Sequence, residues 1–294
     1  MISFRMDNFI IGKNSFIGQQ IAKSLIQKND QWGADWKFTT SNFDQSITEK
    51  NKFFYLDLES PENFDYSILS NKSNIILLAG ISSPDLCEEN KEFAHKINFL
   101  GTKYFINECI KRGARVLFFS SDLVYGKSDN IFDENSLAEP VGFYGKLKRE
   151  IENSFDSSNF KVFRLSYVLS QSDKYIDYLN RCIVDQIEPE IFHPLFRNIV
   201  YIDDVIEATK NILFKWHHFN NMIFNICGEK SISRKDIADK IIKNNCYKIV
   251  NPGEKFWSIR PNNIKVSSLY FESLIQRKPV SFSNAMRIIK HKKK

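Results

Sequence analysis

The sequence predicts an α/β fold with a doubly wound parallel sheet and a smaller C-terminal α/β lobe. Short apolar runs alternate with segments of helical periodicity through the first half of the chain. A glycine turn follows the first apolar run, and turn residues end the later ones. Strands that alternate with helices in this way form parallel sheets with helices on both faces, which is a Rossmann-like arrangement.

The expected elements begin with an apolar strand at 9–11, a glycine turn at 12–18 and a helix at 19–25. A helix is also expected at 93–111, where apolar residues recur at helical spacing. The further strands are expected at 37–40, 53–56, 75–78, 116–119 and 161–165. The sheet domain therefore spans residues 1–165, with returns near 198–226, and residues 166–294 mainly form the smaller lobe.

Composition indicates an ordinary globular protein. The chain has 294 residues, of which 43% are apolar and 26% charged, so disorder and fibrous repeats are excluded. No apolar run approaches the roughly 18 residues of a membrane span, and the first residues lack the apolar core of a signal peptide. We therefore expect a cytoplasmic protein without membrane insertion.

Cysteine and histidine usage gives no indication of a metal site. The five cysteines are scattered and never form a Cys-x-x-Cys pair, which disfavours a disulfide framework or a zinc knuckle. His217 and His218 are adjacent, so on a helix they point in different directions. No metal is expected.

The net charge is +6, and Lys290 with Lys292, Lys293 and Lys294 contributes four positive charges at the end of the sequence. Such a basic tail can bind nucleic acid or can be a solvated terminus. We favour the solvated terminus, and expect no nucleic-acid partner.

The first chemical motif is the turn from Gly12 to Gly18. Backbone amides of such a turn can approach a pyrophosphate, and the following helix N-terminus attracts anions. Ser15 stands where a middle glycine is usual, so a side chain lies near the phosphates. Alone, the motif also fits a strand-helix turn without a ligand.

The second motif is the pair Tyr144 and Lys148. Their i, i+4 spacing places both on one helix face, where an ammonium favours ionisation of a phenol. Upstream, Ser120-Ser121-Asp122 directly follows an apolar strand. A hydroxyl there lies at the carboxyl end of a parallel sheet, where ligands bind in this architecture.

Together these motifs make the chain resemble the extended short-chain dehydrogenase/reductase family, which contains nucleotide-sugar epimerases, dehydratases and reductases. The resemblance covers nearly the whole chain. Its first marks are Gly12 with Gly18, Leu56-Asp57-Leu58, Leu78-Ala79-Gly80 and Asn98 with Gly101-Thr102. Its later marks are Ser120-Ser121-Asp122-Leu123-Val124-Tyr125-Gly126, Tyr144-Gly145-Lys146-Leu147-Lys148, Arg197-Asn198-Ile199-Val200-Tyr201-Ile202-Asp203-Asp204 and Arg260-Pro261.

The resemblance implies a catalytic set. Tyr144 is the implied general acid, Lys148 lowers its pKa and binds the cofactor ribose, and Ser121 orients the carbonyl. Asn98 is implied to support the proton relay. Hydride delivered to a ketone leaves an alkoxide, which needs such a proton donor and hydrogen bonds.

The resemblance also implies binding residues. Arg197 and Arg260 match two arginines that clamp the diphosphate of a sugar nucleotide, a task suited to guanidinium forks. Asp57 matches the carboxylate that holds the adenine amine. The remaining cofactor-binding positions are Gly12, Lys13, Ser15, Phe16, Ile17, Gly18, Leu58, Ala79 and Lys148, and the substrate-binding positions are Ser121, Asp122, Tyr144, Tyr167, Arg197 and Arg260.

The cofactor is expected to be NADPH or NADH. The expected end of the second strand, Thr39-Thr40-Ser41-Asn42, has no carboxylate to accept the ribose hydroxyls of NAD. Lys13 lies early in the turn from Gly12 to Gly18, from which its side chain can reach a 2′-phosphate. These features favour NADPH.

Leu123 and several local motifs make the chain most similar to the dTDP-4-dehydrorhamnose reductase-like branch. Leu123 cannot carry a proton, which argues against dehydration or carbon-acid epimerisation. The expected reaction is reduction of the 4-keto group of a dTDP- or GDP-linked 4-keto-6-deoxyhexose, in the synthesis of surface polysaccharide. Relatives also lead us to expect a homodimer.

Two alternatives remain open at this point. A nucleotide-sugar 4-epimerase uses the same Ser, Tyr and Lys but holds NAD tightly. A non-catalytic dinucleotide-binding subunit would keep the fold alone, as the regulatory subunit of methionine adenosyltransferase resembles this family.

Overall fold

The computed structural model describes residues 6–27, 35–41, 53–242, 244 and 246–291. The chain divides into two compact units, each discontinuous in sequence. Unit 1 comprises residues 1–120, 143–163 and 213–223, and unit 2 comprises residues 121–142, 164–212 and 224–294.

The segment 121–142 thus groups with unit 2, although the sequence pattern places it inside the range 1–165. Its strand β6 (Ile131–Phe132) pairs in parallel with β14 (Asn263–Val266), which lies far along the chain. Of the expected returning segment 198–226, residues 213–223 group with unit 1.

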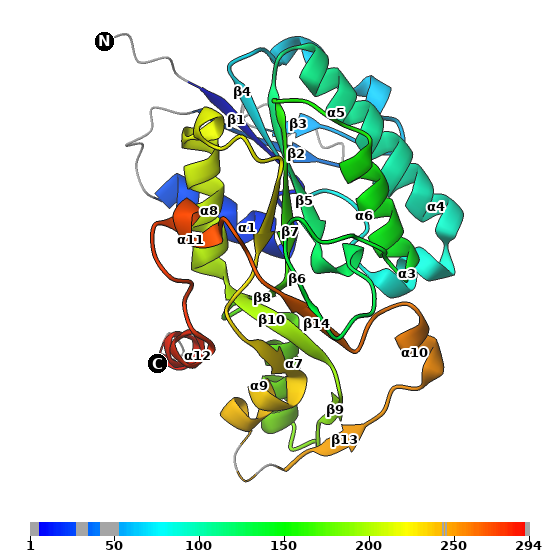
Figure 1. Ribbon diagram of the computed structural model, residues 1–294, viewed down its shortest axis with the longest axis vertical. Coiled ribbons are helices and arrows are strands. Elements are labelled where there is room, and N and C mark those ends of the chain that lie inside the picture. The colour runs from blue at the N-terminus through cyan, green and yellow to red at the C-terminus, as the bar shows by residue number, and fades with distance from the viewer. Residues whose placement is uncertain (1–5, 28–34, 42–52, 243, 245, 292–294) are drawn as a thin grey trace. The chain divides into compact units, whose positions relative to one another are not determined.

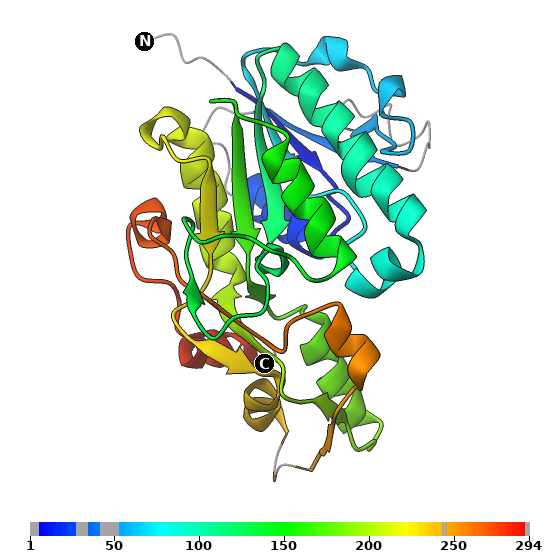
Figure 2. The same ribbon diagram turned by 45° about the vertical axis from the view of Figure 1, so that its right-hand side comes forward.

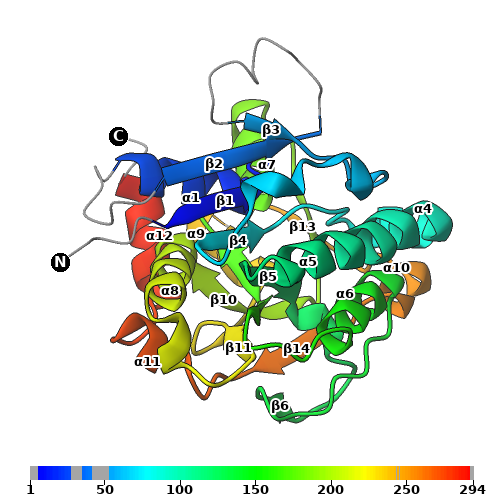
Figure 3. The same cartoon turned by 90° about the horizontal axis from the view of Figure 1, so that it is seen from above.

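The main sheet has seven strands in the order β11-β7-β5-β4-β1-β2-β3, and the β1–β2, β1–β4, β2–β3 and β4–β5 pairs are parallel. Viewed from above, β2, β1, β4 and β5 follow one another across this sheet (Figure 3). The predicted Rossmann-like α/β fold is therefore confirmed. Its strands are β1 (Asp7–Ile11), β2 (Asp35–Thr40), β3 (Phe53–Tyr55), β4 (Ser73–Leu77), β5 (Arg115–Ser121), β7 (Phe160–Leu165) and β11 (Ile223–Ile226).

Helices cover both faces of this sheet within unit 1. α1 (Phe16–Gln27) lies on one face, and α5 (Thr102–Lys111) and α6 (Phe143–Asn153) lie on the other (Figure 1). The sheet is buried between them, as β4 shows, where every residue is buried and the last three, Ile75 to Leu77, are apolar. The shorter helices are α3 (Pro84–Glu89), α4 (Lys91–His95) and single turns at Pro61–Asn63, Tyr66–Ile68 and Trp216–His218.

The helix expected at 93–111 contains a π-helical segment, Lys96–Gly101, between α4 and α5. A Cβ on Gly101 would lie 1.8 Å from the carbonyl oxygen of Leu58, so this helix approaches the chain after β3 more closely than any side chain permits. In both ribbon views the run 91–111 lies beside α6 (Figure 2). π-helical turns are rare in proteins, and those that do occur are often at functional sites.

Unit 2 contains a mixed sheet in the order β12-β10-β14-β6, with β8 (Tyr167–Leu169) paired to β10, and a two-stranded β13–β9 sheet. Ser233 and Asp236 form a capping box at the start of α9 (Arg234–Ile241). The other strands are β9 (Glu190–Phe192), β10 (Phe196–Tyr201), β12 (Ser231–Ser233) and β13 (Lys248–Val250). The other helices are α7 (Lys174–Val184), α8 (Ile202–Phe214), α10 (Glu254–Ser258), α11 (Phe271–Ile275) and α12 (Phe282–His291).

Side chains of the segment 121–142 form part of the core of unit 2. Tyr125 is fully buried, and its hydroxyl donates to Asn225 Oδ1 at 2.9 Å or to the carbonyl of Asp133 at 2.8 Å. Glu134 accepts from the backbone N–H of Asn225 and from the hydroxyl of Ser268. These contacts explain why the segment belongs to unit 2.

None of the helices within the described ranges is both long and apolar enough to cross a membrane.

Candidate functional site

The glycine turn of unit 1 joins β1 to α1 in the expected strand-turn-helix order. Gly12 has φ +88°, and a Cβ there would lie 2.6 Å from the backbone nitrogen of Ala79. Only glycine fits this position, because φ is positive and the backbone of Leu78 and Ala79, just after β4, lies directly against it. The turn thus brings Gly12 and Ala79, two of the predicted cofactor positions, together.

Ser15 caps the helix that follows the turn. Its Oγ accepts a hydrogen bond of 3.1 Å from the N–H of Gly18, and its carbonyl accepts from the N–H of Gln19 at 2.9 Å. Phe16 and Ile17 form the first positions of α1. Ser15, which stands in place of the usual middle glycine, therefore accepts a hydrogen bond from the backbone of the helix that it caps.

The Lys13 ammonium lies against two aromatic rings at the start of the same turn. Its Nζ is 4.6 Å from the ring centroid of Phe38 on β2 and 4.5 Å from that of Phe53 on β3. Cation–π contacts of this kind hold an ammonium at a defined place. Thr39 is buried near the end of β2, whereas Asn42 lies outside the described residues.

Asp57 and Leu58 follow β3. The Asp57 carboxylate is partly exposed and accepts a hydrogen bond of 2.9 Å from the N–H of Glu59. Leu58 is buried, and its carbonyl lies against Gly101.

Tyr144 and Lys148 lie one turn apart on α6, as their spacing predicts. The Lys148 Nζ is 5.8 Å from the Tyr144 ring centroid and donates a hydrogen bond of 2.9 Å to the carbonyl of Phe119 on β5. Lys148 is buried, and this burial lowers its pKa from 10.5 to about 8, although Cys87 and Glu152 favour its charged form. A buried ammonium close to a partly buried phenol is suited to promoting proton transfer from that phenol.

Asn98 binds the loop that follows β4. Its Oδ1 accepts from the N–H of Ile81 at 2.8 Å, and its Nδ2 donates to the carbonyl of Ile81 at 2.9 Å. The same Nδ2 lies 3.7 Å from the Sγ of Cys87. Burial raises the pKa of the Cys87 thiol to about 11. Asn98 thus fixes the backbone of this loop from within the π-helical segment.

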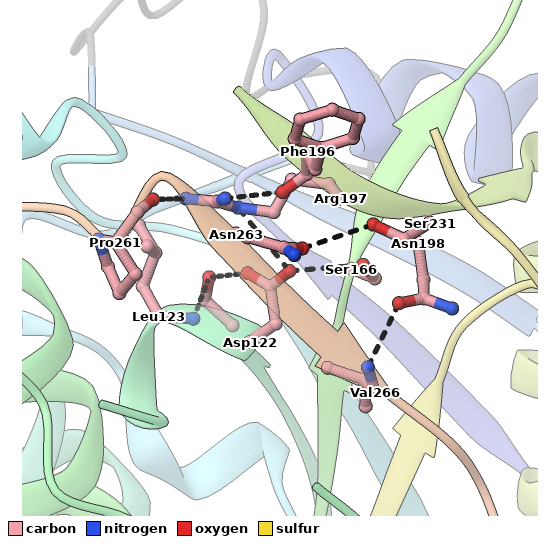
Figure 4. Close-up of polar contacts among 11 residues, drawn as sticks. Asp122, Leu123, Ser166, Phe196, Arg197, Asn198, Ser231, Pro261, Asn263 and Val266 are labelled. Carbon is pink, nitrogen blue, oxygen red and sulfur yellow. Dashed lines mark hydrogen bonds and ion pairs between the residues drawn. The ribbon is translucent and has the colours of Figure 1, made fainter. Parts of the chain in front are cut away.

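In unit 2, Asp122 lies close to Arg197 (Figure 4), and Ser121 contacts Asp122. The Ser121 hydroxyl donates to Asp122 Oδ1 at 3.3 Å and accepts from the N–H of Leu123 at 3.2 Å. Ser166 donates to Asp122 Oδ2 at 3.0 Å, and Arg197 Nε lies 3.8 Å from the same oxygen. Burial raises the pKa of Asp122, while Arg197 and the two serines act in the opposite direction.

The two arginines have different surroundings within unit 2. Arg197 donates to the carbonyl of Phe196 at 2.6 Å and to that of Pro261 at 2.9 Å, in addition to its contact with Asp122 (Figure 4). Arg260 is buried, and its guanidinium lies 4.0 Å from the ring centroid of Phe256.

Tyr167 does not contact the Ser121–Asp122–Arg197 group through its hydroxyl. That hydroxyl donates to the carboxylate of Asp173, at 2.9 Å from each oxygen. Asp173 in turn caps α7 by accepting from the N–H groups of Tyr175 and Ile176.

Sequence reasoning missed three side chains that contact the predicted residues or interact with their charge. Cys87 lies beside Asn98, Ser166 binds Asp122, and Glu152 is a buried carboxylate one turn beyond Lys148 on α6. The i, i+4 spacing of Glu152 from Lys148 was visible in the sequence. The other two contacts join distant segments, so no local pattern indicates them.

Comparison with known proteins agrees with this fold. A family model described as the RmlD substrate binding domain matches residues 6–265. The dTDP-4-dehydrorhamnose reductase of Aggregatibacter actinomycetemcomitans is 22% identical over 245 residues, which are 78% of this chain and 76% of that protein. The methionine adenosyltransferase 2 subunit beta of Xenopus tropicalis is 22% identical over 182 residues, 61% of this chain, and the match spans about half (52%) of that relative's length.

A solved structure is similar over the whole chain. The dTDP-4-dehydrorhamnose reductase from Yersinia enterocolitica has a TM-score of 0.79 at 20% identity, covering 97% of this chain and 99% of that one. The predicted kinship with dTDP-4-dehydrorhamnose reductase-like proteins is confirmed. Because the family model matches most of the sequence, the chain belongs to the RmlD substrate binding domain family.

Proposed function

We propose that this protein is an NAD(P)H-dependent reductase acting on the 4-keto group of a nucleotide-linked 4-keto-6-deoxyhexose. The observation that carries the proposal is the Tyr144–Lys148 pair, in which a buried ammonium lies 5.8 Å from the ring centroid of a partly buried tyrosine. The product would serve deoxysugar and surface-polysaccharide synthesis.

The glycine turn fits a dinucleotide. Gly12 packs closely against the backbone of Ala79, and α1 begins soon after the turn, so backbone N–H groups and the helix dipole would favour a pyrophosphate there. A bound reduced nicotinamide would supply the hydride for the carbonyl carbon. Asp57, Leu58 and Ala79 would contact the adenosine half.

The proton chemistry is assigned to side chains of the chain. Tyr144 would donate its phenolic proton to the alkoxide oxygen, and Lys148 would stabilise the resulting phenolate while binding the ribose. Ser121 would donate a hydrogen bond to the carbonyl oxygen as negative charge develops there. To do so it would exchange its present bond to Asp122 for one to the substrate.

The substrate's diphosphate is assigned to arginines of unit 2. Arg260 would bind it directly, and Arg197 would contribute from its place between Asp122 and two backbone carbonyls. Asp122 and Tyr167 would contact the sugar side. Leu123 supplies no acid or base, which favours simple reduction over dehydration.

We further propose a preference for NADPH. Lys13 is held by Phe38 and Phe53 at the side of the turn where β2 ends, so its charge is available for a 2′-phosphate. The measurement is the ratio of kcat/KM for NADPH and NADH in the unaltered chain and in Lys13→Met. A ratio that does not change would contradict this assignment.

A coupled assay tests the main proposal. dTDP- or GDP-linked 4-keto-6-deoxyhexoses, generated by their dehydratases, are mixed with the protein and NADPH or NADH, and the reduced-nicotinamide absorbance is followed. Substrate-dependent oxidation is expected. No oxidation with NAD released on denaturation would indicate a 4-epimerase instead, and no oxidation without dinucleotide binding would indicate a non-catalytic subunit like the methionine adenosyltransferase relative.

A further inference from the structure

Glu152 is a buried carboxylate to which the proposed function assigns no role. It lies on α6 one turn after Lys148 and is only 1% exposed. Ser120 Oγ on β5 donates to Glu152 Oε1 at 2.7 Å, and Arg149 Nη1 donates to Glu152 Oε2 at 3.0 Å. A carboxylate this deeply buried needs hydrogen-bonding and cationic partners of this kind.

Glu152 and Lys148 together join α6 to β5 at two consecutive strand residues. Lys148 donates to the carbonyl of Phe119, and Glu152 accepts from the hydroxyl of Ser120. The two helix residues are four apart and therefore share one face. Sliding α6 along β5, beside which it lies in Figure 1, would break both bonds, so the pair sets the position of α6 and of Tyr144 one turn earlier.

The charge of Glu152 acts on the ammonium of Lys148. The groups near this ammonium are Cys87 on α3, the Phe118 ring and the Phe119 carbonyl on β5, and Tyr144 and Glu152 on α6. Cys87 and Glu152 both favour the charged lysine, but burial raises the pKa of Cys87 to about 11, so this thiol is neutral near pH 7. Glu152 therefore supplies the negative charge that opposes the burial of Lys148, and Arg149 is its own cationic neighbour.

We propose that Glu152 is the positioning residue of the Tyr144–Lys148 pair, holding α6 in register with β5 through Ser120 and supplying the countercharge of the Lys148 ammonium. The catalytic meaning of this inference rests on the proposed function. The structural part of the inference does not rest on it, because the register of α6 on β5 and the charge state of Lys148 can both be measured without enzymatic turnover.

The charge is tested by titrating the lysine Nζ resonances of ¹⁵N-lysine-labelled protein. Lys148→Met identifies the resonance, and Glu152→Gln removes the charge at nearly constant shape. The proton affinity of Lys148 is expected to fall about tenfold in Glu152→Gln, as removal of a unit charge one helical turn away implies. Glu150→Gln, which removes an exposed carboxylate from the same helix, is the control and leaves the affinity unchanged. Equal titrations in Glu152→Gln and the control would overturn the charge assignment.

The register is tested by Ser120→Ala, which keeps the carboxylate but removes its bond to β5. Faster backbone amide exchange is expected across residues 143–153, with Lys148 still titrating as in the unaltered chain. Unchanged exchange would overturn the register assignment. For the charge test, Glu152→Asp is the conservative variant that matches Glu152→Gln. Because Glu152→Asp retains the carboxylate charge, Lys148 is expected to titrate in it as in the unaltered chain.

If Glu152→Gln does not fold, the double variant Ser120→Ala, Glu152→Met removes the charge without leaving Ser120 unpaired. It is expected to show the same tenfold loss of proton affinity at Lys148. In an active reductase, the alkaline limb of the kcat profile should also move to lower pH in Glu152→Gln. An inactive wild-type protein would overturn the proposed function while leaving the NMR result to decide this inference.

Discussion

At the scale of single residues, burial and charge oppose each other at Lys148. Burial lowers the pKa of this lysine to about 8, whereas Glu152 and the carbonyl of Phe119 interact favourably with its charged form. An ammonium with a lowered proton affinity beside a tyrosine is ready to share in proton transfer near neutral pH. The Tyr-x-x-x-Lys spacing predicted the pair, but only the packed structure shows how the lysine is held.

The burial of Lys148 predicts a particular pH dependence of stability. Its pKa is about 8 in the folded chain and 10.5 when exposed, so between these values the unfolded chain binds more protons and rising pH favours folding. The contribution is fully present above pH 10.5 and is lost as the pH falls through 8. Lys148→Met removes this contribution. The free energy of unfolding of the variant minus that of wild type should therefore be about 2 kcal/mol higher at pH 7 than at pH 10.

The measurement is urea unfolding of both chains at pH 7, 8, 9 and 10. Comparing the two chains cancels the cysteine and tyrosine titrations common to them. A difference in unfolding free energy that stays constant across this range would contradict the assigned titration of Lys148.

Tyr144→Phe is expected to lower kcat by about 10²- to 10⁴-fold, because it removes the phenolic proton without changing the shape of the ring. Dinucleotide binding should stay nearly unchanged, since the ring and Lys148 remain. The measurement is the coupled assay together with a fluorescence titration of NADPH. Tyr104→Phe, an exposed tyrosine on α5, is the control, and full activity in Tyr144→Phe would refute its role as the acid.

At the scale of elements, the start of α1 shows how one residue can serve the helix within a binding motif. Ser15 replaces a glycine of the usual pattern and accepts from the N–H of Gly18, so it caps the helix whose N-terminus would face the pyrophosphate. The sequence showed the replacement but not the direction of the hydroxyl, which depends on the local backbone conformation.

Ser15→Ala should therefore destabilise the protein by about 1 kcal/mol, whereas Ser15→Gly should cost only a few tenths, because glycine is tolerated at a helix N-cap. Ser15→Gly should also bind dinucleotide as tightly as wild type or more tightly. Thermal unfolding and NADPH titration measure the two effects. Markedly weaker binding in the glycine variant would instead show that the serine itself contacts the cofactor.

The strands of the main sheet were predictable because strands buried on both faces are nearly continuous apolar runs. Val116 to Phe119 is such a run, and it forms the middle of β5. The π-helical segment before α5 was not predictable, since it packs Gly101 against the carbonyl of Leu58, more than forty positions earlier. Among site residues, Tyr144 and Lys148 followed from spacing, whereas Ser166 beside Asp122 required the folded chain.

At the scale of the whole molecule, the two units share the chain in alternating pieces. A reading along the sequence favours one boundary near residue 165, but pairing of β6 with β14 and the buried Tyr125 place 121–142 with the later residues. Such long-range pairing leaves no local signal, which is why composition and periodicity do not reveal it.

A fragment of residues 166–294 is therefore expected not to unfold cooperatively. It lacks Tyr125, the partner of Asn225, and Glu134, which accepts from Asn225, Ser268 and the N–H of Leu269. Circular dichroism during urea unfolding measures this. The fragment 121–294, which contains every segment of unit 2, should be more ordered, and a sharp transition in the shorter fragment would contradict the grouping.

The alternating pieces also determine the order in which a growing chain can fold. Strand β7 borders β11 in the main sheet, and the N–H of Val162 donates to the carbonyl of Met222 just before β11. The ribosome must synthesise residues 164–212, which belong to unit 2, before it reaches β11. During that interval the nascent sheet ends in an open edge, which can pair with other chains. Translation through residues 164–212 is thus the stage at which a chaperone that shields strand edges would protect this protein most.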